Sequence, residues 1–363
     1  MSDERVVVAM SGGVDSSVTA ALLLERGFEV IGVTMRLGSQ DDADHDSARP
    51  SCCSMESVED ARRVAGQLGI PFYAVNFETA FKEEVVGYFC KEYSAGRTPN
   101  PCIICNEKLK FGKLLRLAYE LEADRVATGH YARISQDEHT GRYVLRKGVD
   151  AQKDQSYALF SLTQEQLKHI LTPLGDYSKL EVRSIAENLS LKVAQRPESQ
   201  ELCFISDDNY SRFLKEQMEE QIEPGPMLDA AGNVIGQHDG IQFYTIGQRK
   251  GLGSFGKPMY VIKIDPSANA IVIGTKNDLL VRRLLASGAN FISIPMLCKP
   301  TEVTAKIRYN DPGAEGTASP LDDDRFEVVF RQPRMSVTPG QAVVLYDDDV
   351  VLGGGWIDDP SDQ

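Results

Sequence analysis

The chain has 363 residues, of which 42% are hydrophobic and 25% are charged, a composition typical of globular proteins. This length exceeds one ordinary domain, so we expect two or three domains. The formal net charge of -14 excludes a protein that binds nucleic acid through a generally basic surface. Residues 91–116 are locally basic, with six Lys or Arg against two Glu, so RNA binding would depend on such segments.

The cysteine count and the N-terminal residues indicate the compartment. Seven cysteines are an odd number, and their spacing does not form a secreted disulfide framework. Residues 1–5 lack the basic start and apolar stretch of a signal peptide, and no apolar run approaches the roughly 20 residues that span a bilayer. We therefore expect a cytoplasmic protein with reduced thiols and no membrane partner.

The first 130 residues alternate short apolar runs with longer helical patterns. The predicted strands are 6–10, 30–35, 72–77 and 125–128, and the predicted helices are 16–26, 55–68 and 107–121. Strands that alternate with helices predict an α/β fold with a parallel sheet covered on both faces. In such sheets, ligands bind beyond the carboxyl ends of the strands.

The remainder of the chain changes character twice. The pattern is helical from about 163 to 194, where Ser178 and Glu181 form a capping box. From about residue 225, short apolar runs such as 241–246 and 259–264 are separated by Gly, Pro, Asn and Asp. That spacing predicts an all-β region.

The sequence SGGVDSS at residues 11–17 follows the first predicted strand and opens the first helix. Two glycines let the backbone approach a phosphate closely, and serines with free N–H groups at a helix N-terminus bind the anion. A two-glycine turn alone could be an ordinary strand-to-helix connection. The full string in this context favours a phosphate-binding loop, called here the PP-loop.

Three cysteines are candidates for chemistry. Pro99 and Pro101 predict that no helix starts before Cys105, which would place Cys102 and Cys105 on a rigid loop. The following helix dipole and two nearby lysines would favour their thiolates. Cys203 supplies a third thiol. Three thiols do not complete a four-ligand zinc site, although His130 or another cysteine could supply the fourth ligand.

Six motifs occur in a fixed order along the chain: SGGVDSS at 11–17, NPCxxCNxxxKF at 100–111, ATGHYA at 127–132, KDQSY at 153–157, ELCFI at 201–205 and GQRKGLG at 247–253. This series resembles the tRNA-specific 2-thiouridylases known as MnmA, a family of PP-loop ATP pyrophosphatases. The resemblance covers almost the whole chain. It implies a PP-loop (adenine nucleotide alpha hydrolase-like) catalytic domain with a helical extension at 1–208, a small central tRNA-contacting domain at 209–277 and a C-terminal antiparallel β-barrel at 278–363.

The resemblance also implies roles for individual residues. Cys105 would be the catalytic nucleophile and Cys203 would receive the persulfide, and the two can form a disulfide after the sulfur leaves. ATP would be bound by Ala9, Met10, Ser11, Gly12, Gly13, Val14, Asp15, Ser16, Met35 and Gly129, with Asp15 near the magnesium-bound pyrophosphate. The target base and the tRNA would contact Asn100, Pro101, Cys102, His130, Lys153, Asp154, Gln155, Arg308, Tyr309 and Gln341.

The implied reaction is ATP- and Mg²⁺-dependent sulfur transfer to the C2 position of wobble uridine 34. ATP adenylates the C2 oxygen, and sulfur from the Cys203 persulfide, either directly or as sulfide released by Cys105, displaces AMP. The implied partners are tRNAs of the Lys, Glu and Gln type and a cysteine desulfurase or sulfur-relay protein.

One departure from the family pattern leaves the sulfur route open. Some members have Asp where this chain has Cys102. Cys102, Cys105 and Cys203 therefore also resemble the ligands of a [4Fe–4S] cluster in iron–sulfur-dependent tRNA thiolases. Two other hypotheses are a PP-loop amide-forming ligase, which would explain the PP-loop alone, and a zinc- or redox-binding RNA module, which would explain the cysteines alone.

Overall fold

The computed structural model describes residues 4–38, 55–196, 202–205, 207, 209–218 and 222–360. The chain forms two compact units. The first comprises Met1–Val85, Cys102–Asp208 and Asp349–Val351, and the second comprises Val86–Pro101, Asn209–Asp348 and Leu352–Gln363. Among the residues described, no helix has the length and apolar character needed to cross a membrane.

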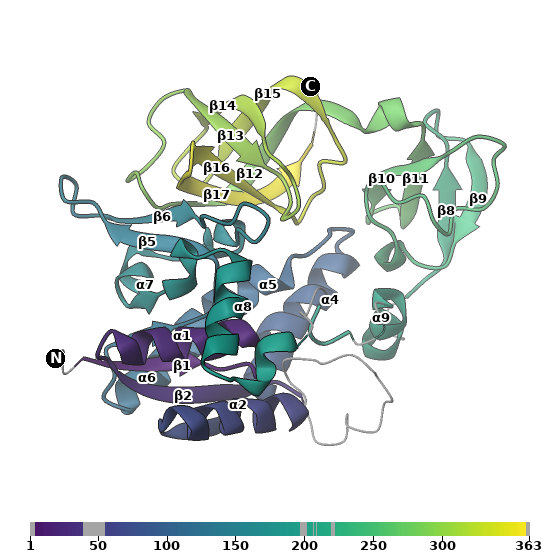
Figure 1. Cartoon of the computed structure of the whole chain (residues 1–363). Helices are drawn as coiled ribbons and strands as arrows, with labels where there is room; N and C mark the ends of the chain where they lie inside the picture. Colours follow the sequence, from purple (N-terminus) through teal and green to yellow (C-terminus); the bar gives the residue numbers. More distant parts are fainter. Residues whose placement is uncertain are drawn as a thin grey trace. The chain divides into compact units, whose positions relative to one another are not determined.

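The first unit contains a five-stranded sheet in which every pair of neighbouring strands is parallel. Strands β1 and β2 of this sheet are labelled in Figure 1. The strand order is β3-β2-β1-β4-β7, with β1 (Arg5–Ala9), β2 (Glu29–Arg36), β3 (Phe72–Asn76), β4 (Arg125–Ala127) and β7 (Ile170–Leu171). The predicted parallel sheet is confirmed. The fifth strand was missed because two residues inside a helical pattern carry no strand periodicity.

Helices pack on this sheet around one hydrophobic core. Helix α1 packs against β1 and β2, α2 packs against β2 and β3, and α8 packs against α1. The helical elements are α1 (Val14–Glu25), α2 (Met55–Leu68), α3 (Glu78–Phe81), α5 (Pro101–Ile104), α6 (Leu114–Glu120), α7 (Gln164–Lys168) and α8 (Lys179–Asn188), with π-helical η2 (Lys82–Val86) and η3 (Cys105–Lys113) and 3₁₀ turns η4 (Ser156–Leu159), η5 (Pro173–Asp176) and η6 (Lys192–Gln195). The predicted capping box of Ser178 and Glu181 is confirmed by both of its hydrogen bonds.

An antiparallel hairpin completes the first unit. Strands β5 (Ala132–Gln136) and β6 (Tyr143–Lys147) pair with each other, and Arg146 pairs with Val350. Because β5 begins only five residues after β4 ends, the hairpin fixes the direction in which residues 128–131 leave the sheet.

The second unit begins with α4 (Gly87–Ser94), α9 (Tyr210–Met218) and a four-stranded sheet of order β10-β11-β8-β9. Its strands are β8 (Gly225–Leu228), β9 (Val234–His238), β10 (Tyr260–Asp265) and β11 (Ala270–Gly274). Residues 241–246, predicted as a strand, instead begin with the 3₁₀ turn η8 (Ile241–Phe243). Buried side chains of a turn produce the same apolar run as a short strand, so composition alone did not separate them.

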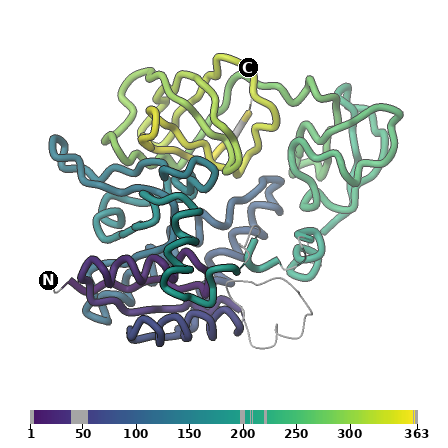
Figure 2. The backbone as a smooth tube through the Cα atoms, viewed as in Figure 1, coloured from purple at the N-terminus to yellow at the C-terminus, as the bar shows by residue number. Residues whose placement is uncertain are grey.

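The backbone then passes from β11 through η9 (Lys276–Leu279) into the C-terminal part of the chain (Figure 2). The strands there form a six-stranded antiparallel barrel. Its order is β12-β15-β14-β13-β16-β17, and pairing of β12 with β17 closes it. The strands are β12 (Leu280–Phe291), β13 (Thr301–Lys306), β14 (Ala314–Pro320), β15 (Phe326–Met335), β16 (Ala342–Asp347) and β17 (Val350–Asp359). The predicted C-terminal β-barrel is therefore confirmed.

Candidate active site

The PP-loop lies where the strand order of the parallel sheet reverses. The loop follows β1, and residues 128–131 follow β4, the strand on the other side of β1 from β2. Connections from β1 and β4 lead to opposite sides of this point in the sheet, and α/β sheets bind ligands beyond the carboxyl ends of the strands at such a reversal. Two of the predicted motifs, SGGVDSS and ATGHYA, therefore meet at the position where α/β sheets bind ligands.

Hydrogen bonds fix the shape of the PP-loop. The Ser16 hydroxyl accepts from the Ser11 amide at 3.1 Å and donates to the Gly13 carbonyl at 3.2 Å. The Ser17 hydroxyl also donates to the Gly13 carbonyl, at 2.8 Å. Gly13 is the N-cap of α1, so Ser16 and Ser17 brace the first turn of that helix. The unpaired N–H groups at this end can then bind an anion.

Two of the predicted ATP-binding glycines are required by close backbone packing. Gly12 has φ +71°, and a Cβ at this position would collide with the Ser57 carbonyl oxygen. A Cβ on Gly129 would lie 2.9 Å from the Asp15 Cβ and 3.0 Å from the Ser16 nitrogen. Gly129 therefore lets the β4 connection touch the PP-loop directly, which joins two parts of the predicted nucleotide site.

Asp15 is held by two groups that the sequence did not indicate. The Lys179 Nζ donates to both Asp15 carboxylate oxygens, at 2.7 and 2.8 Å, and the Tyr131 hydroxyl donates to Oδ1 at 2.6 Å. Lys179 is buried, whereas the Asp15 side chain keeps 32% of its surface exposed. The carboxylate is thus charge-balanced and oriented while part of it still faces solvent, where a magnesium ion could contact it.

Arg196 ties the PP-loop to helix α2. One guanidinium nitrogen donates to the Gly12 carbonyl at 3.0 Å and to the Asp60 carboxylate, and the other donates to the Ser57 hydroxyl at 3.0 Å. The rigid fork of an arginine suits three acceptors fixed on two elements. Arg196 and Lys179 lie far from residues 11–17 in the sequence, and neither belongs to a motif that pointed to the loop.

The cysteine segment differs from its prediction. Helix α5 starts at Pro101, so Cys102 lies in its first turn, and Cys105 starts the π-helical stretch η3. The expected rigid loop before a helix is wrong because proline is favoured in a first helical turn, where its missing N–H has no partner to lose. Cys102 is exposed and Cys105 is half-buried. π-Helical turns are rare and occur frequently at functional sites.

The two lysines near these cysteines have other partners. Lys108 forms an ion pair with Glu107 at 2.7 Å, which raises the pKa of Lys108. The Lys110 Nζ donates to the side-chain oxygen of the buried Asn106 at 3.0 Å. The predicted effect of Lys108 and Lys110 on the thiolates of Cys102 and Cys105 stays a prediction.

Cys203 lies half-buried in a turn that packs against helix α3. The Ile205 amide donates to the Leu202 carbonyl at 3.0 Å and closes the turn. The Phe204 ring contacts Phe81 of α3 edge-on at 5.6 Å, and α3 also packs against η3, which begins at Cys105. Short helix α3 thus links the elements that carry the two predicted catalytic cysteines.

His130 is a buried and neutral group. Its Nδ1 shares a 2.7 Å hydrogen bond with the Thr128 hydroxyl, and its ring packs against Phe111 of η3. Burial lowers the pKa of His130 well below its usual value, and the positive charge of Lys110 lowers it further. His130 can therefore hydrogen-bond to a ligand but does not supply a positive charge at neutral pH.

Residues 153–155 organise the turn before η4. The buried Asp154 accepts from the amides of Gly148 and Ser156, at 3.2 and 3.1 Å. Gln155 pairs with the main chain of Tyr131 through its own amide and its side-chain oxygen. Lys153 is half-buried in the same turn. This turn therefore supports the connection that carries His130.

The remaining predicted tRNA contacts lie in the second unit. Arg308 and Tyr309 are exposed in the loop after β13, which the buried Asp311 organises by accepting from the amides of Ile307 and Gly313. Asn100 is half-buried and Pro101 is buried. The Gln341 side-chain amide donates to the carbonyls of Thr98 and Pro99.

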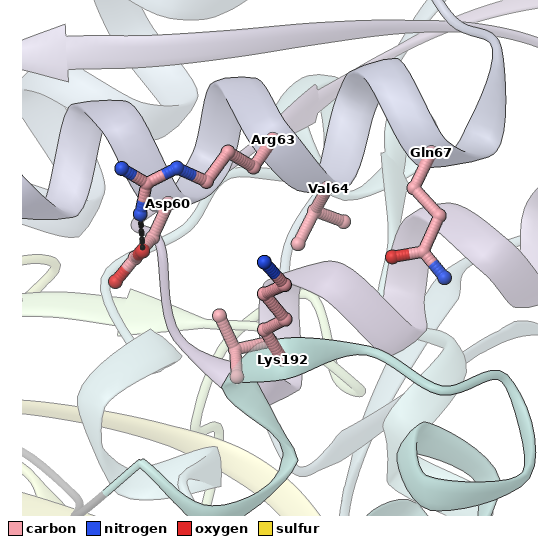
Figure 3. Close-up of a pocket in the computed structure, with 6 residues that line it drawn as sticks. Asp60, Arg63, Val64, Gln67 and Lys192 are labelled. Atoms are coloured by element: carbon pink, nitrogen blue, oxygen red, sulfur yellow. Dashed lines mark hydrogen bonds and ion pairs between the residues drawn. The ribbon is translucent and has the colours of Figure 1, made fainter.

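A small cavity lies beside α2 and does not include the PP-loop (Figure 3). It has a volume of about 230 Å³ and is lined by Asp60, Arg63, Val64, Gln67, Lys192 and Val193. Pockets for cofactors usually measure about 300–1,000 Å³. The cavity is therefore too small for a nucleotide, although its Asp60 belongs to the Arg196 network.

The described residues contain no cluster of three or more His, Cys, Asp or Glu side chains arranged to hold a metal ion. This statement covers Cys102, Cys105 and Cys203, which the structure describes, but not residues 39–54, where two further cysteines lie. The alternative of a cluster bound by these three thiols remains a prediction for experiment.

Three family models match consecutive parts of the chain. They are the tRNA methyl transferase HUP domain at residues 4–207, the tRNA methyl transferase PRC-barrel domain at 211–275 and the aminomethyltransferase beta-barrel domain at 281–357. Together they cover nearly the whole chain.

Curated proteins named tRNA-specific 2-thiouridylase MnmA match over the full length. The protein from Acetivibrio thermocellus is 51% identical over 98% of this chain and 100% of its own length. The protein from Heliobacterium modesticaldum is 55% identical over 98% and 92%, and that from Clostridioides difficile is 50% identical over 98% of both. Among solved structures, a 4-thiouridine synthetase bound to RNA and ATP matches at 18% identity over 60% of this chain and 51% of its own, with a TM-score of 0.34, too low to support an argument.

Proposed function

We propose that this chain, which belongs to the family of tRNA-specific 2-thiouridylases, uses ATP to replace the C2 oxygen of wobble uridine 34 of tRNA with sulfur. The observation that carries the proposal is the meeting of the PP-loop with residues 128–131 at the reversal of strand order, in the unit that also carries Cys105 and Cys203. An ATP-activating site and two thiols in one unit are what sulfur transfer to an activated carbonyl requires.

ATP would bind along the PP-loop and the neighbouring strand ends. The residues proposed to hold it are Ala9, Met10, Ser11, Gly12, Gly13, Val14, Asp15, Ser16, Met35 and Gly129. The close packing of Gly12 and Gly129 supports this assignment because it fixes the shape of the PP-loop, and the N-terminus of α1 in this loop has no side-chain cap. Magnesium, held through the exposed part of Asp15, would neutralise charge on the departing pyrophosphate.

The first chemical step would activate the base. The C2 oxygen of uridine attacks the α-phosphorus of ATP, the bond between the α-phosphorus and the bridging oxygen breaks, and pyrophosphate leaves with the electron pair. The N3 proton of uridine is lost in this step. The protein would contribute by binding the α-phosphate at the α1 N-terminus and by holding the base in an orientation for in-line attack.

The second step would transfer sulfur from a Cys203 persulfide to C2 of the activated uridine. The terminal sulfur of a Cys203 persulfide attacks C2, and AMP leaves with the former C2 oxygen. The Cys105 thiolate then attacks the Sγ of Cys203, which breaks the S–S bond and leaves the sulfur on C2. A proton returns to N3, and an external thiol reduces the resulting Cys105–Cys203 disulfide. A cysteine desulfurase or relay protein would restore the persulfide.

The proposal extends to the substrate, the domains and the location. The tRNA would be of the Lys, Glu or Gln type and would contact Asn100, Pro101, Cys102, His130, Lys153, Asp154, Gln155, Arg308 and Tyr309, among other residues. We infer domains at 1–208, 209–277 and 278–363, which the ranges of the three family models support. The absence of a secreted disulfide pattern among seven cysteines supports a cytoplasmic location.

The test is thiolation of unmodified tRNA by Cys105→Ser and Cys203→Ser, with a desulfurase, cysteine and ATP. Both variants are expected to lose at least about 1,000-fold in rate because serine cannot carry a persulfide or resolve one. Their tRNA dissociation constants should stay within about twofold of the unmodified protein. Cys298→Ser, which alters an exposed cysteine of the second unit, is the matched control and should retain full activity.

Other outcomes would identify the competing functions. Pyrophosphate release that does not depend on tRNA would indicate an amide-forming ligase, and tight zinc binding without ATP turnover would indicate a binding module. Iron and sulfide near four per chain after anaerobic purification, lost in Cys102→Ser and required for activity, would replace the persulfide route with a [4Fe–4S] cluster. Loss of tRNA binding in Cys105→Ser or Cys203→Ser would contradict their catalytic assignment.

A further inference from the structure

Residues 97–101, called here the proline segment, have few main-chain N–H groups that can donate hydrogen bonds to the rest of the protein. Pro99 and Pro101 have no N–H group, so Thr98 and Asn100 carry the only main-chain donors between residues 98 and 101. A sheet ladder cannot form along such a segment. Its carbonyl oxygens must instead be satisfied by donors from elsewhere in the fold.

The barrel supplies those donors at one point. The Thr98 amide donates to the Pro339 carbonyl at 2.8 Å. The Gln341 Nε2 donates to the carbonyl oxygens of both Thr98 and Pro99, at 3.0 Å each. A primary amide carries two N–H hydrogens on one nitrogen, so one neutral side chain can hold two consecutive carbonyls.

Neighbouring contacts make this attachment rigid. Gly340 has φ +88°, and a Cβ there would lie 2.9 Å from the Thr98 oxygen and 3.0 Å from the Arg97 Cβ, so the segment and the barrel touch backbone to backbone. The Ile357 amide donates to the Gln341 carbonyl at 2.8 Å. The Arg97 guanidinium reaches Asp358 at 3.2 Å and the Ile357 carbonyl at 3.3 Å.

We propose that Gln341 is a positioning residue that fixes the main chain of the proline segment, and through it the placement of Asn100 against the target base. This goes beyond the tRNA contact that the family resemblance implies for Gln341, because both hydrogens of its amide are used within the protein. The inference rests on the proposed function, since Asn100 meets a target base only in an enzyme that thiolates tRNA.

The experiment compares Gln341→Met with Gln332→Met in the full-length protein. Methionine matches glutamine in length but donates no hydrogen bond, and Gln332 is an exposed residue of β15 in the same barrel. Three quantities are measured for each: kcat for thiolation, the dissociation constant for tRNA, and amide hydrogen exchange at Thr98 and Asn100 without tRNA.

A positioning role predicts a specific combination of results. In Gln341→Met, kcat falls about 10- to 100-fold, as expected for a misplaced reacting group, while the tRNA dissociation constant stays within about twofold. Exchange at Thr98 and Asn100 becomes about 10-fold faster. Gln332→Met leaves all three unchanged. A raised dissociation constant with unchanged kcat would overturn the proposal in favour of a direct tRNA contact, and unchanged exchange would overturn it as well.

Failure of this inference can be told apart from failure of the proposed function. If the unmodified protein does not thiolate tRNA, the proposed function fails, while faster exchange in Gln341→Met would still establish that Gln341 holds the segment. If the unmodified protein is active and Gln341→Met matches it in kcat, only the positioning role fails.

Discussion

The PP-loop of the first unit and the proline segment of the second are both short connections held by distant residues, but they are held by different chemistry. Charged side chains hold the PP-loop, because Lys179 donates hydrogen bonds to Asp15 and Arg196 donates one to the Gly12 carbonyl. Main-chain groups and a neutral amide hold Thr98 and Pro99 of the proline segment, and the charged contacts of that segment are made by Arg97 at its start. A loop that receives polyphosphate needs balanced charge beside the ligand, whereas a segment that presents a base needs only a fixed conformation. The two regions should therefore respond differently to loss of a charge.

The largest effect is expected from Lys179→Met. The substitution leaves the Asp15 carboxylate without its counter-charge beside the proposed pyrophosphate site, where negative charge accumulates during adenylation. We expect tRNA-dependent pyrophosphate release to slow roughly 100-fold, equivalent to about 2.7 kcal/mol in the barrier. The measurement is a pyrophosphate assay at saturating ATP and tRNA.

A double-mutant cycle with Asp15→Asn separates this charge effect from general damage. Because the two groups contact each other, the double variant should lose clearly less than the product of the single losses. If the double variant loses as much rate as the product of the two single losses, Lys179 acts independently of Asp15. The proposal that charged contacts hold the PP-loop would then be wrong at Lys179.

A smaller effect is expected from Arg196→Lys, with Arg63→Lys as the matched control. Lysine keeps the charge but cannot contact the Gly12 carbonyl, Asp60 and the Ser57 hydroxyl in one rigid fork. Arg63 also pairs with Asp60, at 3.1 Å, but its side chain is 63% exposed and does not touch the PP-loop. We expect the KM for ATP to rise about 10-fold in Arg196→Lys and to change less than about twofold in Arg63→Lys. Equal changes in the KM for ATP would mean that Arg196 acts through its contact with Asp60 and not through its contact with the PP-loop.

The sequence predicted the parts of the site whose residues are adjacent in the chain. SGGVDSS carries its turn, its anion-binding groups and its helix start within seven residues, so local chemistry identified it. Lys179, Tyr131 and Arg196 could not be found in this way, because they reach residues 11–17 only after the chain has folded. At Lys179 the visible signal was the capping box around it, which explains a helix start and nothing more.

The errors in the fold have local causes as well. The predicted loop around Cys102 and Cys105 is wrong because Pro101, which would break a helix at an interior position, favours a helix at the first helical position. The strand at Ile170 and Leu171 is too short to show a period of two. The parallel sheet was predictable because its alternating strands and helices extend over many residues, and the PP-loop because its motif is continuous in the chain. The pattern after residue 225 indicated only an all-β region, and the barrel was an expectation from the family resemblance.

The smallest effect is expected from the pH dependence of stability, which compares a buried histidine in each unit. Burial lowers the pKa of His130 well below 6.5, with a further contribution from the charge of Lys110. Burial also lowers the pKa of His238, where a hydrogen bond to the Asn269 carbonyl and, after it, the charge of Asp239 oppose the shift. In each case the unfolded chain binds a proton near pH 6.5 that the folded protein does not, so the stabilising contribution is complete above pH 6.5 and is lost as the pH falls below it. Each histidine can add a slope of at most about 1.4 kcal/mol per pH unit to the free energy of unfolding.

Urea unfolding of His130→Asn and His238→Asn between pH 7.5 and 5 measures the two contributions. Both variants should lose less stability than the unmodified protein as the pH falls, because asparagine does not titrate. The difference should be larger for His130→Asn, since a neighbouring cation strengthens the pKa shift of His130, while a hydrogen bond to Asn269 and a neighbouring anion weaken that of His238. A larger difference for His238→Asn would mean that the charge of Lys110 is screened from His130. Charged side chains would then influence the PP-loop but not His130, in residues 128–131 after β4.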